Sequence, residues 1–157
     1  MTSLLTTGQQ APDFALPNQD GVECRLSSYR GSWVLIYFYP RDNTPGCTQQ
    51  ACGIRDSFPD FSKSKVTVLG ISTDSVVSHK KFAEKYTLPF NLLADTEKEV
   101  VRAYGVWAPK KFMGREFLGV QRTSFLIDPA GVIAKIYEGV KPALHAQEVL
   151  HDMESHV

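Results

Sequence analysis

The chain has 157 residues, of which 43% are hydrophobic and 22% charged, and this length and composition predict a single globular domain over residues 1–157. Seventeen basic residues balance seventeen acidic ones, so no excess of positive charge favours nucleic acid as a ligand. Three cysteines are too few, and odd in number, for a disulfide scaffold, and in a reducing compartment such residues are more often catalytic or buried.

The first ten residues have no basic region, and their only apolar stretch is the pair Leu4 and Leu5. This pattern predicts neither a signal peptide nor a membrane span. We therefore expect a cytoplasmic protein that does not act at a membrane, with a leader removed before residue 1 as the open alternative.

Strand-like and helical segments alternate along the chain. Residues 14–16 and 22–26 flank the turn-forming residues 18–21, and this pattern predicts an N-terminal β-hairpin. Residues 33–39 are a nearly continuous run of β-branched, aromatic and leucine residues, which is typical of a central strand buried on both faces.

A helix is expected over about residues 45–61, with Pro59 ending or kinking it. The elements expected after it are a strand over 66–72, a helix over 76–86, a short strand over 88–93, a helix over 96–104, a hairpin of strands 124–128 and 132–137, and a final helix over 142–153. Thr96 is the expected cap of its helix, with Glu99 at the capping-box position. Strands interleaved with helices indicate an α/β sandwich with a mixed sheet.

The loop after the predicted central strand has the features of a reactive site. It reads PRDNTPGC over residues 40–47, and ligands of α/β folds bind at the carboxyl ends of strands. Thr44 and Pro45 suit the cap and first turn of a helix, so Cys47 is expected near a helix N-terminus. The unpaired N–H groups there form a small anion site, which favours the thiolate, the reactive form of cysteine.

Cys52 follows Cys47 by five residues. In an α-helix this spacing corresponds to a rotation of about 500° and a rise of ~7.5 Å, which places the two Cα atoms roughly 8 to 9 Å apart. Because a disulfide needs Cα atoms closer than about 7 Å, a bond between these two cysteines requires local unwinding of the helix.

The remaining candidate residues give weaker signals. Cys24 lies inside a predicted hairpin strand and is interpreted as a packing residue. The four histidines, at positions 79, 145, 151 and 156, do not have the spacing of metal ligands. The sequence therefore predicts neither a metal site nor a cofactor.

The motif around Cys47 resembles that of the peroxiredoxins, and within them the bacterioferritin comigratory protein, or PrxQ, group. The matching segments are YPRDNTPGCT over residues 39–48, ACG over 51–53, RD over 55–56, YGVW over 104–107, FMG over 112–114 and RTSFLID over 122–128. The resemblance extends over roughly residues 8–153. It implies a thioredoxin-like α/β sandwich with a central mixed sheet and an N-terminal β-hairpin extension.

The resemblance also implies an activity and a role for each site residue. Cys47 would be the peroxidatic cysteine, which reduces hydrogen peroxide and organic hydroperoxides and becomes a sulfenic acid. Cys52 would resolve this acid to an intramolecular disulfide, which thioredoxin or a similar dithiol reduces. Arg122 would stabilise the thiolate and hold two oxygens, Thr44 would orient the peroxide, and Pro40 would limit the access of water.

Several alternatives stay open from the residues alone. Cys52 could be a packing residue, Thr44 only a helix cap, and Arg122 a surface ion-pair residue. Gln50 occupies a position where many other peroxiredoxins carry glutamate, and it could orient an arginine. A thioredoxin-type disulfide oxidoreductase would need a Cys-x-x-Cys pair, which this spacing does not provide. Besides the peroxidase and the disulfide oxidoreductase, a third functional class is a redox sensor or holdase, in which Cys47 is oxidised once without turnover. Because resolution within one chain needs no dimer, we expect a monomer.

Overall fold

The computed structural model describes residues 5–155, so Leu4, on which the N-terminal expectation partly rested, and His156 lie outside the described residues. The elements in chain order are β1 (Ala15–Pro17), β2 (Glu23–Arg25), the 3-10 helix η1 (Leu26–Tyr29), β3 (Trp33–Phe38), α1 (Pro45–Asp56), α2 (Phe58–Lys63), β4 (Val66–Ser72), α3 (Val76–Tyr86), β5 (Asn91–Ala94), α4 (Glu99–Ala103), β6 (Trp107–Phe112), β7 (Arg115–Val120), β8 (Thr123–Ile127), β9 (Ile133–Tyr137) and α5 (His145–Glu154). Within the described part of the chain, no helix is long and apolar enough to cross a bilayer.

The central sheet has five strands in the order β5-β4-β3-β8-β9. Strands β3, β4 and β5 run parallel to one another, whereas β8 is antiparallel to both β3 and β9. This arrangement confirms the mixed sheet expected from the alternation of strands and helices. It also places the carboxyl end of β3, from which the Cys47 loop departs, at the middle of the sheet.

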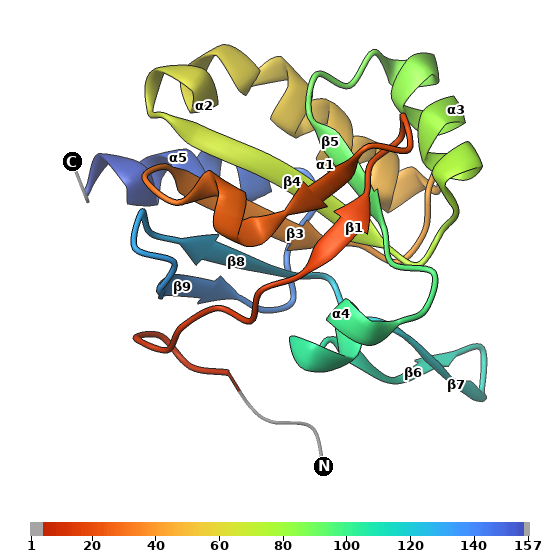
Figure 1. The fold of residues 1–157 in the computed structure, drawn as a ribbon. Coiled ribbons are helices and arrows are strands. Elements are labelled where there is room, and N and C mark those ends of the chain that lie inside the picture. The colour runs from red at the N-terminus through yellow and green to blue at the C-terminus, as the bar shows by residue number, and fades with distance from the viewer. Residues whose placement is uncertain (1–4, 156–157) are drawn as a thin grey trace.

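Two apolar layers cover the two faces of this sheet (Figure 1). Helices α1, α2, α3 and α5 pack on one face, where their buried residues form one core cluster with the sheet. The β1–β2 hairpin, η1 and α4 contribute to a second cluster on the opposite face. The functional loop therefore lies on the side of the sheet that is covered by the four longer helices.

Strand β3 has apolar side chains on both faces, as the sequence predicted. Leu35 and Tyr37 belong to the cluster under the helices, and Val34 and Ile36 belong to the opposite one. Gly70 on β4 is paired with Tyr37, and a Cβ atom at this position would lie 2.8 Å from the Tyr37 phenol oxygen. The tyrosine ring is therefore accommodated because its neighbouring strand has no side chain there.

The N-terminal hairpin is confirmed, although its first strand is shifted by one residue and its second is two residues shorter than predicted. β1 and β2 pair antiparallel, and the Asn18 side-chain oxygen accepts hydrogen bonds from the backbone amides of Asp20 and Val22. Gly21 has a φ of 76°, in the left-handed region that glycine adopts without strain. The Asn-to-Gly order of the turn therefore determines where the hairpin reverses.

The predicted helix over 45–61 is in fact two helices, α1 and α2. Ser57 ends the first and precedes the second, and its φ and ψ of −97° and 5° fall outside the helical range. Pro59 lies in the first turn of α2, two residues after this break, so the predicted interruption of the helix near Pro59 is confirmed, although a second helix follows it. A proline has no amide hydrogen, so it is tolerated in a first turn, where that hydrogen would have no helical partner.

Two further predictions differ from the structure, and one pair of strands was not predicted. Helix α4 is capped by Lys98, which has a left-handed φ of 61°, so Thr96 is not its cap. Strand β5 begins at Asn91, beyond the predicted start near Pro89. The antiparallel pair β6–β7 was not predicted at all. Most of its residues are at least partly exposed, so its sequence does not show the apolar pattern of a buried strand.

Candidate active site

Cys47 lies in the first turn of α1, directly after the loop that leaves β3. Thr44 is the N-cap residue with an extended backbone, and Pro45 begins the helix. The first helical hydrogen bond runs from the Thr48 amide to the Thr44 carbonyl over 2.8 Å. The backbone amide of Cys47 therefore precedes the helical ladder, at the positive end of the helix dipole, as the sequence predicted.

Arg122 contacts the sulfur of Cys47 directly. Its Nη2 donates to Cys47 Sγ over 3.3 Å, and its Nη1 donates to Gln50 Oε1 over 2.6 Å. The Arg122 carbonyl accepts a hydrogen bond from the Val140 amide, which ties the residue to the segment between β9 and α5. The structure thus brings two of the predicted site residues together, and the predicted contact of Gln50 with an arginine is present.

The surroundings of this pair exclude most of the solvent. The exposed fraction of Cys47 is 2% and that of Gln50 is 1%. A charge–dipole interaction is stronger in such an environment than in water because the effective dielectric constant is lower. The permanent positive charge of Arg122 therefore acts on the Cys47 sulfur with little screening by water.

The hydroxyl of Thr44 donates to the Arg41 carbonyl over 2.9 Å. Its side chain does not accept a hydrogen bond from the first turn of α1, so the cap is formed by its backbone only. With the hydroxyl hydrogen used in this bond, the lone pairs of the oxygen are directed elsewhere and can accept a hydrogen bond from a ligand. Pro40 is half-buried, directly after Tyr39.

Cys52 lies in the same helix as Cys47 and is partly exposed, and both residues are free thiols. Cys24 is also a free thiol, but it is buried in the core cluster on the opposite face of the sheet. Its Sγ lies 3.8 Å from the Val22 carbonyl. The central sheet therefore separates Cys24 from the Cys47 site, which agrees with a packing role.

Three polar groups near the site were not predicted from the sequence. Burial raises the pKa of Tyr37 well above its usual value, with a further contribution from the nearby Cys47. Burial lowers the pKa of His145, the neighbouring Arg122 lowers it further, and Glu148 acts in the opposite direction. Burial and the charge of Arg122 also lower the pKa of Lys110. The sequence carries no local signal for these neighbours because each comes from a different element.

Some buried polar atoms around the site have no hydrogen-bond partner among the described residues. They include the phenol oxygen of Tyr37, Gln50 Nε2, Ser124 Oγ and both ring nitrogens of His145. His145 Nδ1 lies 3.5 Å from a carboxylate oxygen of Glu148. Because burial favours its neutral form, His145 does not add a second full positive charge beside Arg122.

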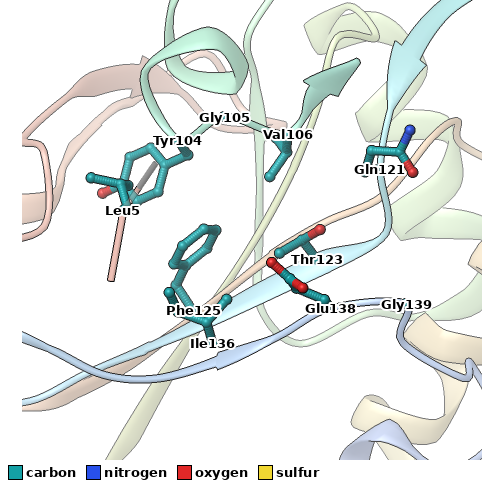
Figure 2. Close-up of a pocket in the computed structure, with 10 residues that line it drawn as sticks. All are labelled: Leu5, Tyr104, Gly105, Val106, Gln121, Thr123, Phe125, Ile136, Glu138 and Gly139. Carbon is teal, nitrogen blue, oxygen red and sulfur yellow. The ribbon is translucent and has the colours of Figure 1, made fainter. Parts of the chain in front are cut away.

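A cavity of about 260 Å³ lies apart from the sulfur (Figure 2). Its lining residues are Leu5, Tyr104, Gly105, Val106, Gln121, Thr123, Phe125, Ile136, Glu138 and Gly139. Gln121 and Thr123 flank Arg122 in the sequence, but none of the five predicted site residues lines this cavity. The chemistry of Cys47 therefore belongs to a different part of the molecule.

Comparison with known proteins agrees with this geometry. Residues 7–136 match the model of the AhpC/TSA family. Peroxiredoxin Bcp of Escherichia coli strain K12 is 45% identical over 152 residues, which cover 97% of each chain. This chain belongs to the AhpC/TSA family and is a peroxiredoxin of the Bcp, or PrxQ, type.

Solved structures of related peroxiredoxins share the fold. A mutant of PrxQ from Xylella fastidiosa superposes with a TM-score of 0.92 at 32% identity and covers 98% of both chains. The bacterioferritin comigratory protein of Xanthomonas campestris, studied for its alkyl peroxide reduction activity, gives a TM-score of 0.89 at 34% identity and covers 96% of this chain and 99% of its own. This peroxiredoxin therefore has the thioredoxin-like fold and is a peroxidase that acts through a cysteine.

Proposed function

We propose that this peroxiredoxin reduces hydrogen peroxide and organic hydroperoxides with Cys47 as the peroxidatic cysteine. The observation that carries the proposal is the 3.3 Å hydrogen bond from Arg122 Nη2 to Cys47 Sγ at the start of α1. A sulfur held by a permanent cation at a helix N-terminus has the environment that activates a thiolate. The alkyl peroxide reduction activity of the Xanthomonas campestris relative supports the inclusion of organic hydroperoxides.

In the first step, the Cys47 thiolate attacks the terminal oxygen of the peroxide. The O–O bond breaks, Cys47 becomes a sulfenic acid, and the other oxygen leaves as an alcohol or water after it takes a proton. Arg122 offers two N–H groups to the charge that moves from sulfur to the leaving oxygen. The Thr44 oxygen accepts a hydrogen bond from the peroxide and so orients the attack, and Pro40 keeps water from the sulfur.

In the second step, the Cys52 thiolate attacks the sulfur of the Cys47 sulfenic acid. Hydroxide leaves and takes a proton to become water, a disulfide forms within the chain, and an external dithiol such as thioredoxin reduces it by thiol–disulfide exchange. Both cysteines lie in α1, where five residues of helix keep their Cα atoms roughly 8 to 9 Å apart. The helix must therefore unwind before the disulfide closes.

A monomer suffices for this cycle because both cysteines belong to one helix of one chain. The monomeric state and the cytoplasmic location stay predictions. A redox sensor or holdase differs from this proposal in one respect, since it would oxidise once without turnover.

The test is stopped-flow consumption of hydrogen peroxide in the presence of thioredoxin, thioredoxin reductase and NADPH. We expect continuous turnover by the natural chain and its loss in Cys47→Ser, with Cys24→Ala as the matched control that retains turnover. One equivalent of peroxide consumed without turnover would support the sensor instead.

Replacement of Cys52 tests the resolving role separately. Cys52→Ser should keep the fast first oxidation but lose recycling by thioredoxin. Normal recycling in this variant would show that another thiol resolves the sulfenic acid. Crystals of the reduced and oxidised protein with the same intact α1 would contradict the unwinding step.

A further inference from the structure

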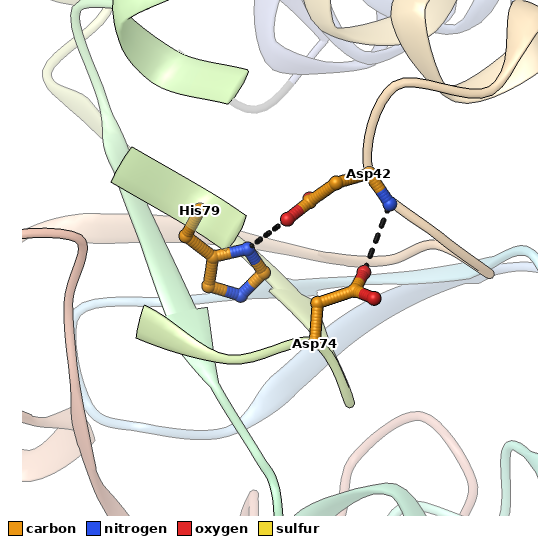
Figure 3. A group of neighbouring side chains, drawn as sticks. All are labelled: Asp42, Asp74 and His79. Carbon is orange, nitrogen blue, oxygen red and sulfur yellow. Dashed lines mark hydrogen bonds and ion pairs between the residues drawn. The ribbon is translucent and has the colours of Figure 1, made fainter. Parts of the chain in front are cut away.

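A buried polar network lies beside the loop that carries Cys47. Its centre is Asp42, whose side chain is 4% exposed. One carboxylate oxygen, Oδ1, accepts a hydrogen bond from the Tyr39 hydroxyl over 2.6 Å. The other, Oδ2, lies 2.7 Å from both the Ser78 hydroxyl and His79 Nδ1 (Figure 3). Asp42 belongs to the loop between β3 and α1, whereas Ser78 and His79 belong to α3.

The hydrogen-bond partners determine the proton positions on His79. Its Nε2 lies 2.9 Å from the Leu93 carbonyl oxygen, which can only accept, so Nε2 carries a hydrogen. Its Nδ1 faces the carboxylate of Asp42, which accepts from two hydroxyls as well. Both ring nitrogens of this fully buried histidine therefore have a hydrogen-bond partner. Removal of the ring would leave the buried Asp42 carboxylate with one partner fewer, which is costly where water cannot replace the lost contact.

The backbone of the loop is held at the same place. The Asp42 amide donates to Asp74 Oδ2 over 2.8 Å (Figure 3). The Ser72 hydroxyl donates to the same oxygen over 2.7 Å. Asn43 has a left-handed φ of 58°, and its side-chain oxygen accepts from the Tyr86 hydroxyl over 3.2 Å. Both residues that precede Thr44 are therefore attached to the end of β4 or to α3.

These hydrogen bonds connect the loop to α3 beside an open groove. A groove of about 390 Å³ is lined by Asp42, Asn43, Ser75, Val77, Ser78, Lys81, Phe82 and Lys85. Asp42, Asp74 and His79 also bring ligand-type atoms within 4.8 Å of one another. Hydrogen bonds already engage those atoms, so no cation is needed to explain the cluster.

We propose that Asp42, Ser78 and His79 are positioning residues that hold the Cys47 loop in its folded form and oppose the unwinding of α1 that brings Cys47 to Cys52. This inference rests on the proposed function, because it assigns the network to the two steps of that cycle. Peroxide reacts with the folded loop, where Arg122 contacts the sulfur. Disulfide closure requires the unwound helix. Asp42, at the centre of the network, lies five residues before Cys47. The network therefore anchors the N-terminal end of the segment that unwinds.

The test compares His79→Leu with His79→Asn in the reduced, full-length protein. Leucine removes both hydrogen bonds of the ring, whereas the asparagine amide can still donate to Asp42. Loss of a hydrogen bond to a charged group shifts an equilibrium by roughly tenfold or more. We therefore expect amide hydrogen exchange over residues 44–52 to rise by about this factor in His79→Leu. In His79→Leu, single-turnover oxidation of Cys47 should be slower and formation of the Cys47–Cys52 disulfide should be faster than in the natural chain. Both rates of His79→Asn should lie between those of His79→Leu and the natural chain.

Ala83→Gly is the matched control, because it weakens the same helix by a similar amount without touching the loop. It should leave the ratio of the two rates unchanged. If both rates fall together in His79→Leu, or if Ala83→Gly gives the same exchange pattern, the network only stabilises the fold and the proposal is wrong. If His79→Leu does not fold, Ser78→Ala replaces it in the test, since it removes only one hydrogen bond to Asp42. We expect its amide exchange and its two reaction rates to change in the same direction as in His79→Leu, but by less.

The exchange measurement separates this proposal from the proposed function. It needs no peroxide, so the contrast between His79→Leu and Ala83→Gly can be obtained even if the chain does not turn over. A natural chain that fails to consume peroxide would contradict the proposed function alone. A natural chain that consumes it, with unchanged exchange in His79→Leu, would contradict the positioning role alone.

Discussion

Arg122 and Cys47 are separated by 75 positions in the sequence, yet Arg122 Nη2 donates a hydrogen bond to Cys47 Sγ over 3.3 Å. The second arm of the same guanidinium donates to Gln50, one turn further along α1. The arginine therefore reaches α1 at two points, and only one of these contacts involves the reacting atom. Each contact can be removed separately.

Removal of the cation should strongly slow the first step. In Arg122→Ala, neither the thiolate nor the leaving oxygen has a positive neighbour, and we expect a loss of about 100-fold or more in the rate of Cys47 oxidation. Arg122→Lys should recover only part of it, because one ammonium group cannot replace the planar pair of donors. Single-turnover stopped-flow with hydrogen peroxide measures both variants. An unchanged rate in Arg122→Ala would remove this residue from the site.

Gln50 should affect the same step through Arg122. In Gln50→Ala, Arg122 Nη1 loses its 2.6 Å acceptor, and we expect a decrease of about tenfold in the oxidation rate. Gln49→Ala is the matched control, since Gln49 is exposed on the same helix. Equal rates in the two variants, measured under the same conditions, would show that Gln50 does not orient the guanidinium.

Gly53 gives a way to strengthen α1 without adding a contact. A Cβ at this position meets no heavy atom within 4 Å, and Gly53 lies inside the helix. Gly53→Ala should stabilise the helix by about 1 kcal/mol relative to the unwound form. Closure of the Cys47–Cys52 disulfide should then slow by up to about fivefold, while oxidation of Cys47 stays the same. Thiol trapping followed by mass spectrometry measures the closure, and an unchanged closure rate would mean that unwinding does not limit it.

His145 should make the protein less stable in mild acid. Burial lowers its pKa below the usual 6.5, so the unfolded chain binds a proton at a higher pH than the folded protein does. This contribution to stability is complete above pH 6.5 and is lost as the pH falls toward the lowered pKa. In His145→Phe, which keeps an aromatic ring against Tyr137, the free energy of unfolding should vary less between about pH 7 and pH 5.

Urea titrations of both proteins across this pH range test the prediction. The difference between the two curves isolates His145, because the other titrating groups are shared. Asp13 and Asp152 have pKa values lowered from 3.8, so they contribute only at more acidic pH. Parallel curves for the natural chain and His145→Phe would contradict the assignment of a lowered pKa.

Part of the fold follows from local residue patterns. The apolar run over residues 33–39 predicted the central strand, and the order Asn18 to Gly21 predicted the hairpin turn, because both depend on neighbours in the chain. The interruption of the helix near Pro59 was also predicted, but not that a second helix begins there with Pro59 in its first turn. A proline that would disrupt a helix interior is compatible with a first turn, and the pattern alone did not distinguish these positions.

The site divides in the same way. The sequence by itself determined that Cys47 lies near a helix N-terminus after a central strand, since Thr44 and Pro45 encode that start within a few residues. Only the tertiary structure decided that Arg122 contacts the sulfur and that His79 Nδ1 lies 2.7 Å from a carboxylate oxygen of Asp42. These contacts join segments tens of residues apart, and their geometry depends on strand order and helix packing. The conformational preferences of neighbouring residues do not encode this geometry.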